Sequence, residues 1–301
     1  MRGRWRWVPL AGGLILLIVL AGVFGLRPFR DGLRQVTPTT VAVAVGMTAL
    51  STVSVAVRWR LIAGGLGLRL SLPESVRAYY RSQFLNVVLP GGILGDLDRG
   101  LTASSGAATR LPGLRSVWWD RVSGQAVQLA SAGLALALLP SPLGRRLPFG
   151  VPLAAGLLGL AIVAAVFGYA GRTGAVPARH RPAVIGTSLI AVAAHASVFV
   201  VAVRAAGVHA PPAQLVPVTL AVLVATSIPT NVAGWGAREG AAAGLFAFTG
   251  LGADAGLSAA TAYGVLVMIA VAPGAAVLAL AALRRPSRPR AEQREWVAVD
   301  G

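Results

Sequence analysis

The sequence predicts an all-α membrane protein of six to eight transmembrane helices, arranged as two repeats that each contain a Gly/Pro-broken, re-entrant module. Three observations lead to this prediction. Hydrophobic residues make up 55% of the 301 residues and charged residues only 12%, whereas about a quarter of a soluble domain is charged. Several apolar runs approach the roughly 20 residues that a helix needs to cross the hydrocarbon core. Two similar segments rich in proline and glycine recur 139 residues apart.

Six apolar runs are the predicted membrane spans. The first follows the basic segment MRGRWRW and resembles the apolar part of a signal peptide. It lacks a clear cleavage site and further spans follow it, so we interpret it as an uncleaved helix. In chain order the runs cover residues 10–26, 39–57, 122–139, 149–170, 183–203 and 255–283.

The basic residues lie where membrane proteins carry them. The formal net charge is +17, and every basic residue is an arginine because the sequence contains no lysine. Arginines gather before the first apolar run and after the last, at Arg2, Arg4, Arg6, Arg284, Arg285, Arg288, Arg290 and Arg294. This placement follows the positive-inside rule and suits anionic lipid headgroups. We therefore expect no nucleic-acid partner, a bacterial plasma (inner) membrane location, and both termini in the cytoplasm.

Several kinds of chemistry are excluded by what the sequence lacks. There is no cysteine, which excludes disulfides, thiolate metal sites and cysteine nucleophiles. No segment between the apolar runs is both long and polar enough to fold as a soluble catalytic domain, which needs ~50 residues or more, and no Gly-x4-Gly-Lys loop for ATP occurs. We predict a protein that is not an enzyme and binds neither metal nor cofactor. Residues 284–301 are predicted to form a basic, disordered cytoplasmic tail.

The segments NVVLPGGILGDLDRG, at 86–100, and SIPTNVAGWGAREG, at 227–240, indicate an internal repeat. At an offset of 139 residues a proline, a glycine and an arginine coincide, and so do Pro73 and Pro212 upstream. The chain therefore divides into a first membrane repeat, 1–140, and a second, 141–283, each with the order span, span, broken module, span. The predicted helix-breaking residues are Pro90, Gly91, Gly92 and Gly95 in the first module and Pro229, Gly234 and Gly236 in the second.

Broken helices at equivalent places in two repeats are typical of a transport site near the membrane midplane. Non-helical backbone is tolerated at that depth only where protein or a water-filled cavity surrounds it, and half-helices would direct free N–H groups and positive dipole ends into such a cavity. Re-entrant modules, which make the repeats inverted, leave fewer arginines outside than crossing modules do, so the positive-inside rule favours them. Crossing modules in parallel repeats stay open, because residues 73–89 would form a helix of ~25 Å.

Three motifs, LNVVLPGGILGDLDR, SVWWDRVSG at 116–124 and IPTNVAGWGAREG, resemble the flippase-like transmembrane family. This family occurs as the membrane domain of lysylphosphatidylglycerol synthase and as stand-alone bacterial proteins. Its first motif has Gly-Gly-Asp followed by an arginine; here Gly95, Asp96 and Arg99 are kept and Leu94 replaces the first glycine. The second motif, Gly-x-Gly-x-Arg-Glu, is complete at Gly234, Gly236, Arg238 and Glu239. The resemblance implies translocation of a lipid, in better-known relatives an aminoacylated phosphatidylglycerol, without the synthase's soluble aminoacyl-transfer domain.

The polar residues of the two modules form the candidate headgroup site. They are Asn86, Asp96, Asp98, Arg99, Asn231, Arg238 and Glu239. Arg99 and Arg238 suit charge-assisted, bidentate contact with a lipid phosphate. Alternatively, each arginine pairs with a nearby carboxylate and holds its module together. The carboxylates are also compatible with a divalent metal or with acid–base catalysis, and the two asparagines with capping of freed backbone.

Three further residues are candidates for gating or coupling. Asp120 and Arg121 follow a tryptophan pair at the start of a span, where a local ion pair is the alternative interpretation. His195 lies within a span, where an ionisable side chain is a functional candidate, although a neutral histidine also bonds neighbouring helices. The predicted partner is a membrane phospholipid, and a homo-oligomer and a separate lipid-modifying enzyme stay open as further partners. A membrane-embedded glycosyl- or acyltransferase and a non-transporting accessory protein are the alternative functions.

Overall fold

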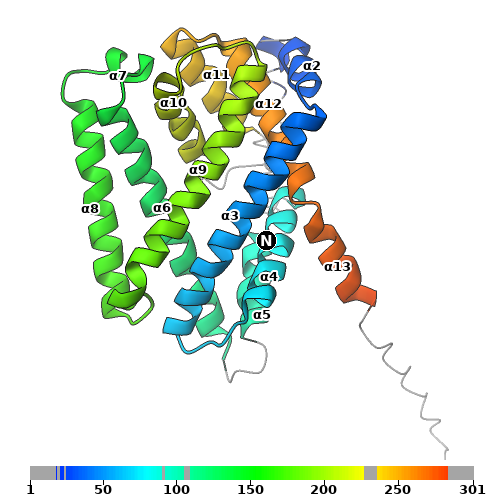
Figure 1. The fold of residues 1–301 in the computed structure, drawn as a ribbon, viewed down its shortest axis with the longest axis vertical. Helices are drawn as coiled ribbons and strands as arrows, with labels where there is room; N and C mark the ends of the chain where they lie inside the picture. The colour runs from blue at the N-terminus through cyan, green and yellow to red at the C-terminus, as the bar shows by residue number, and fades with distance from the viewer. Residues whose placement is uncertain are drawn as a thin grey trace, which may run out of the picture.

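The computed structural model describes residues 18, 21–23, 25–89, 92–104, 109–226 and 236–283. Within these ranges the chain forms twelve α-helices (α2–α13), one short 3-10 helix (η2) and no strand, which confirms the predicted all-α class (Figure 1). Most of the predicted first span and the tail lie outside the described residues. So do five of the predicted helix-breaking and headgroup-site residues, namely Pro90, Gly91, Pro229, Asn231 and Gly234.

Most of the helices have a proline as their first or second residue, which fixes the backbone angle that a helix needs and gives up only an amide that would be unpaired there. In chain order the elements are α2 (Arg27–Arg34), α3 (Pro38–Gly65), α4 (Leu72–Val88), α5 (Leu94–Ala103), α6 (Leu111–Leu138), α7 (Pro142–Arg146), α8 (Val151–Arg172), η2 (Ala178–His180), α9 (Arg181–Ala205), α10 (Pro212–Ala225), α11 (Ala237–Thr249), α12 (Ala253–Ala270) and α13 (Pro273–Leu283).

Four helical segments are long and apolar enough to cross a membrane, and they coincide with four of the predicted spans. They are Pro38–Gly65, Val151–Arg172, Ala178–Ala205 and Ala253–Ala281. The last span is not one continuous helix, because the turn before Pro273 separates α12 from α13. The predicted span 122–139 lies almost wholly within α6, whose 28 residues are long enough for a crossing but include polar and charged side chains.

Helices α4 and α5 pack against each other as a helical hairpin, and α10 and α11 form a second hairpin. The first hairpin occupies the lower part of the molecule in Figure 1 and the second the upper part. The four arms have 17, 10, 14 and 13 residues. At 1.5 Å per residue these correspond to lengths between ~15 and ~25 Å, short of the ~30 Å of a bilayer core.

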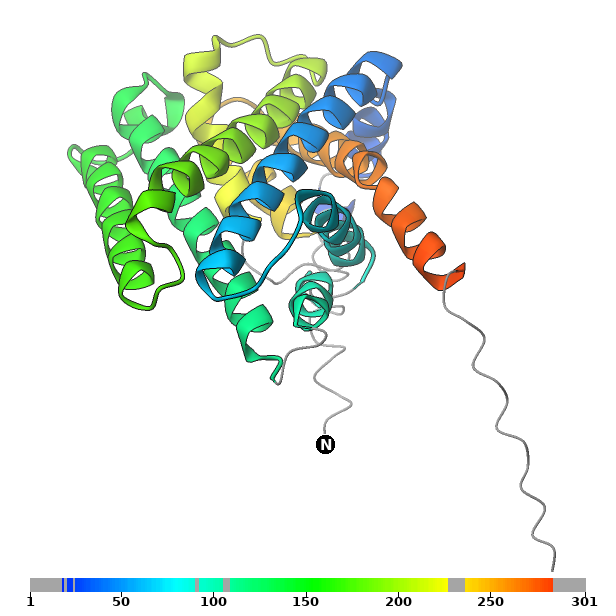
Figure 2. The ribbon, with the colours of Figure 1, turned by 60° about the horizontal axis from the view of Figure 1, so that its bottom comes forward.

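The first hairpin depends on a close crossing of its two helices. A Cβ atom at Gly95 would lie 2.1 Å from the carbonyl oxygen of Ser82, so only glycine fits at this point of α5. Helix α4 also contacts α13, and α5 also contacts α6. Figure 2 accordingly shows the hairpin between α6 and α13, with α6 and α8 forming one flank of the molecule.

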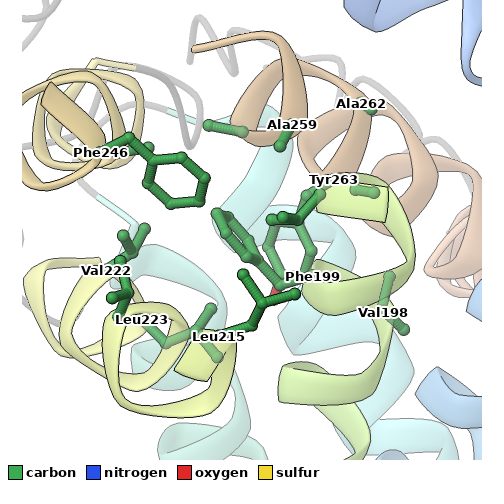
Figure 3. Close-up of a cluster of buried hydrophobic side chains, with 14 of the residues drawn as sticks. Val198, Phe199, Leu215, Val222, Leu223, Phe246, Ala259, Ala262 and Tyr263 are labelled. Atoms are coloured by element: carbon green, nitrogen blue, oxygen red, sulfur yellow. The ribbon is translucent and has the colours of Figure 1, made fainter. Parts of the chain in front are cut away.

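An apolar cluster fixes the second hairpin against the rest of the helices. Figure 3 shows Leu223 of α10, Phe246 of α11, Phe199 of α9 and Tyr263 of α12 converging in this cluster, where each is nearly or completely buried. Such packing places Tyr263 beside the second module, with its ring centre 5.3 Å from the guanidinium carbon of Arg238. The outer face of α8 instead exposes several leucines, as expected of a surface that faces lipid.

Candidate functional site

A cavity of about 400 Å³ is lined by residues of both hairpins. Its walls include Asn86 near the end of α4 and Thr226 just after α10, together with residues from the starts of α5 and α11. Helices α3, α6, α9 and α12 supply the remaining walls. The cavity is therefore bounded by both halves of the chain.

Asp120 is the centre of a buried charge network on the first half. Its Oδ1 accepts a hydrogen bond from Nε of Arg58 at 2.8 Å, and its Oδ2 accepts one from Nη2 of Arg99 at 3.0 Å. The hydroxyl of Tyr79 also donates to Oδ2. The Asp120 side chain is fully buried, so two arginines are needed near it to offset the cost of removing its charge from water.

Asp96, in the first turn of α5, joins the hairpin tip to α6. Its Oδ1 accepts from Ser82 and from Arg99, at 3.2 and 3.0 Å. Its Oδ2 accepts from Nδ2 of Asn86 at 3.0 Å and from two nitrogens of Arg121, of which Nε lies at 2.6 Å. All these donors leave the carboxylate fully engaged.

Asn86 binds both sides of the break between α4 and α5. Its Oδ1 accepts from the backbone N–H of Gly95 at 2.8 Å, while its Nδ2 donates to Asp96. The N–H of Gly95 is therefore not free to face a ligand. This contact corresponds to the interpretation in which the asparagine pairs backbone that the helix break has freed.

Arg99 lies against two aromatic rings as well as two carboxylates. Its guanidinium carbon is 3.9 Å from the ring centre of Tyr79 and 4.6 Å from that of Trp59. The indole N–H of Trp59 donates to Ser116 at 3.0 Å, which fixes the ring. Cation–π contact thus accompanies the ion pairs in holding an arginine whose side chain is only 1% exposed.

The second module has a simpler arrangement around Glu239. The carboxylate accepts from the N–H of Gly236 at 2.7 Å and from Nε and Nη2 of Arg238 at 3.0 and 2.5 Å. Arg238 also lies over the ring of Tyr263, 5.3 Å from its centre, and the Tyr263 hydroxyl is 3.0 Å from Nδ1 of His195. A Cβ atom on Gly264 would lie 2.2 Å from Arg238, so this glycine makes space for the guanidinium.

Comparison with known families decides which class of protein this geometry belongs to. The sequence pattern of one family, described as the lysylphosphatidylglycerol synthase TM region, matches residues 7–274. The chain belongs to this family. Among curated proteins, none matches the chain. The family match and the four apolar helices make the chain a membrane protein related to lipid synthesis or translocation.

All the described residues that line the cavity lie within the matched part of the chain. The cavity brings together most of the residues that the sequence analysis selected. The predicted residues that line it are Asn86, Gly92, Asp96, Arg99, Arg121, His195 and Arg238. Asp120 and Glu239 lie behind this lining, bonded to its arginines. Asp98 faces elsewhere, because its carboxylate pairs with Arg81 at 2.6 Å.

The described glycines of the modules have different roles. Gly92 and Gly236 have φ angles of +60° and +107°, in the left-handed region that favours glycine, and each directly precedes a module helix or its cap. Gly95 lies inside α5 instead of at a break, and its role is the close crossing with Ser82. Asp120 and Arg121 bind different partners, Arg58 and Arg99 for the first and Asp96 for the second, so they are not a local ion pair.

Sequence reasoning missed Arg58, Tyr79 and Tyr263. Arg58 directly follows the predicted span 39–57 and looks like an ordinary flanking charge, whereas it is buried beside Asp120 and also donates to Ser188 at 3.1 Å. The VAVR tetrapeptide that contains it recurs at Arg204, which is exposed. The two tyrosines carry no sequence signal, because aromatic residues in apolar helices are common.

Proposed function

We propose that the protein translocates an anionic or aminoacylated phospholipid between the two leaflets of a bacterial plasma membrane. The headgroup passes through the polar cavity while the acyl chains stay in the bilayer. One observation carries this proposal: two hairpins whose arms are shorter than a bilayer core line the same cavity, and each brings an arginine to it, Arg99 from one and Arg238 from the other.

The arrangement of the helices supports inverted repeats with re-entrant modules. Pro73 and Pro212, which the repeat alignment pairs, both lie in the first turn of a hairpin, that is, of α4 and α10. The hairpins approach the cavity from opposite ends of the molecule, and none of their arms is as long as a bilayer core. Helices α3 and α9, at equivalent places in the two repeats, pack together and run in opposite directions (Figure 1). This geometry is typical of transporters whose site lies near the midplane.

The charges around the cavity support an anionic headgroup. Among the described residues, four arginines line it: Arg58, Arg99, Arg121 and Arg238. Three carboxylates pair with them, from Asp96, Asp120 and Glu239. The site therefore has one more positive charge than negative, and one phosphate group would balance it.

Arg121 is the arginine best placed to receive the phosphate first. Its side chain is 40% exposed, compared with 9% or less for the other three arginines. A phosphate presents the same two-oxygen geometry as a carboxylate and can replace Asp96 on the guanidinium. Exchange of one anion for another keeps the arginine paired throughout, which avoids leaving a bare charge inside the membrane.

In this proposal the protein is not an enzyme, and its partner is a membrane phospholipid. Energy comes from an ion gradient or from the lipid gradient itself, because the spans carry no ATP-binding loop. His195, hydrogen-bonded to Tyr263 beside Arg238, is the residue through which a proton gradient would act. Both termini are assigned to the cytoplasm on the positive-inside rule.

The test is leaflet exposure of fluorescent lipids in proteoliposomes, measured by dithionite quenching. Wild type should move an anionic or aminoacylated lipid faster than empty liposomes do, and Arg99→Ala and Arg238→Ala should each lose this activity. Arg204→Ala, at an exposed arginine remote from the cavity lining, is the matched control and should behave as wild type.

Two results would contradict the proposal. If Arg99→Ala and Arg238→Ala kept wild-type rates while remaining folded, the cavity would not carry the headgroup. If instead Asp96→Asn and Glu239→Gln abolished formation of a lipid product without affecting lipid binding, a membrane-embedded transferase would replace translocation as the function.

A further inference from the structure

We propose that the cavity selects a phospholipid whose headgroup is a monoanionic phosphodiester with uncharged hydroxyl groups, such as phosphatidylglycerol, and rejects the aminoacylated form of the same lipid. This inference rests on the proposed function and narrows its substrate. An aminoacyl group adds at least one ammonium, whose positive charge a buried site offsets with a carboxylate or an aromatic face, which a neutral amide does not do. Both kinds of receptor are present here, but the protein's own arginines occupy them.

The carboxylates are already bonded to the protein's own arginines and other donors. Asp96 is the only carboxylate among the described residues that line the cavity, and it already accepts from Ser82, Asn86, Arg99 and Arg121. Asp120 is engaged by Arg58, Arg99 and Tyr79, and Glu239 by Arg238 and the N–H of Gly236, and both are 0% exposed. An ammonium could use Asp120 or Glu239 only by displacing an arginine, and when a phosphate replaces Asp96 on Arg121, Asp96 still accepts from Ser82, Asn86 and Arg99.

The aromatic faces are occupied in the same way. Tyr79 and Tyr263 are the aromatic residues among the described lining of the cavity. The guanidinium of Arg99 lies 3.9 Å from the ring centre of Tyr79, and that of Arg238 lies 5.3 Å from the ring centre of Tyr263. The ring faces that would bind an ammonium by cation–π contact therefore already hold an internal cation.

Neutral hydrogen-bonding groups, by contrast, are still available. Gln125 and Gln128 of α6 line the cavity, and within the described part of the chain their side-chain amides form no hydrogen bond. A primary amide both donates and accepts, as does a hydroxyl, so these side chains can bind a glycerol headgroup without any change of charge. The excess positive charge then receives the single phosphate.

The experiment compares lipid binding and lipid movement in the same preparations. Purified protein is offered equal amounts of phosphatidylglycerol, lysylphosphatidylglycerol and phosphatidylethanolamine, with retained lipid counted by native mass spectrometry, and translocation is measured in parallel by leaflet exposure. Glycerophosphoglycerol, the headgroup without acyl chains, is added as a soluble competitor. We expect phosphatidylglycerol to be retained about tenfold over the lysyl form, the effect of one unpaired polar or charged group.

A single substitution should reverse this preference. Gln128→Glu adds a carboxylate to the cavity wall, about 10 Å along α6 from Arg121. The variant should retain the lysyl form at least as well as phosphatidylglycerol. Gln214→Glu makes the same chemical change at a residue outside the cavity lining and should keep the wild-type preference.

The outcomes separate this inference from the function on which it rests. Equal or preferred retention of the lysyl lipid by wild type, or retention of no lipid, would overturn the inference whether or not the variants fold. If glycerophosphoglycerol, which has no acyl chains, displaced the retained phosphatidylglycerol, the headgroup would not need to come from a lipid. If the preference holds but wild type moves no lipid, translocation fails and selective binding of phosphatidylglycerol stands.

Discussion

Arg121 and Asp96 form an ion pair across 25 residues of sequence, joining α6 to the first turn of α5 at the wall of the cavity. It is the most exposed of the cavity's ion pairs, whereas the pairs of Asp120 are closed off completely. The site thus combines a rigid inner network with one outer pair that a headgroup can enter. Exchange at this pair requires the least rearrangement, since only one arginine changes partner.

The outer pair gives the first prediction. Arg121→Ala should lower the rate of lipid translocation at least tenfold, and Arg121→Lys should recover only part of it, because an ammonium cannot make the two parallel hydrogen bonds of a guanidinium. Thermal melting should change little, because the Arg121 side chain is 40% exposed and Asp96 keeps its bonds to Arg99 and Asn86. A wild-type rate for Arg121→Ala would show that the lipid does not exchange with Asp96.

The inner network predicts a loss of stability instead. Asp120→Asn leaves Arg58 and Arg99 buried with one negative charge fewer, which should cost about 3–5 kcal/mol and abolish or greatly reduce folded protein. Asp98→Asn is the matched control, because its pair with Arg81 is at the surface and its side chain is 42% exposed. Gel filtration and thermal melting in detergent measure both variants. Equal stability of the two would contradict a structural role for Asp120.

The hairpin tip is predicted to depend on Asn86. Removing its side chain with Asn86→Ala leaves the N–H of Gly95 without its acceptor, at a cost of about 1–3 kcal/mol. Asn86→Asp keeps that acceptor but places a second negative charge beside Asp96, so it should be destabilised as well. Unfolding midpoints of the two variants check this. Asn86→Ala melting like wild type would mean that the tip is held by other contacts.

Two Gly→Ala substitutions test whether Gly264 is needed as space for Arg238 or only lowers helix propensity. Gly264→Ala would place a methyl group 2.2 Å from Arg238 and should displace the guanidinium, lowering translocation while the protein stays folded. Gly244→Ala, on α11, meets no atom within 4 Å and should keep full activity, with stability equal to wild type or about 1 kcal/mol higher. Full activity of Gly264→Ala would remove the positioning of Arg238 from the account.

The long apolar helices of the fold could be predicted from the apolar runs of the sequence. Long apolar runs at residues 39–57, 149–170 and 183–203 become long apolar helices, because hydrophobic content and length alone determine whether a helix can cross a bilayer. The break before Pro273 was missed, since the apolar run continues unbroken across it and only local backbone geometry separates α12 from α13. The two-repeat division stays a prediction that the helix order supports.

The candidate site was predictable in part, for a physical reason. Asp96, Arg99 and Arg238 stand out because charges beside glycines and prolines are unusual in apolar sequence. Arg58 and Tyr79 do not stand out, because their importance comes from contact with Asp120 across 62 and 41 residues of sequence. Asp98 was predicted to belong to the site but does not line the cavity. Its place in the motif does not reveal that its side chain turns toward Arg81.

The most direct test of the account is leaflet exposure of fluorescent phosphatidylglycerol in proteoliposomes containing wild type or the Arg99→Ala, Arg238→Ala double variant, at equal protein density. The account predicts that wild type brings inner-leaflet lipid into reach of dithionite and that the double variant, folded by gel filtration, leaves it protected as in empty liposomes. Identical quenching by wild type and empty liposomes, for anionic and aminoacylated lipids alike, would contradict it.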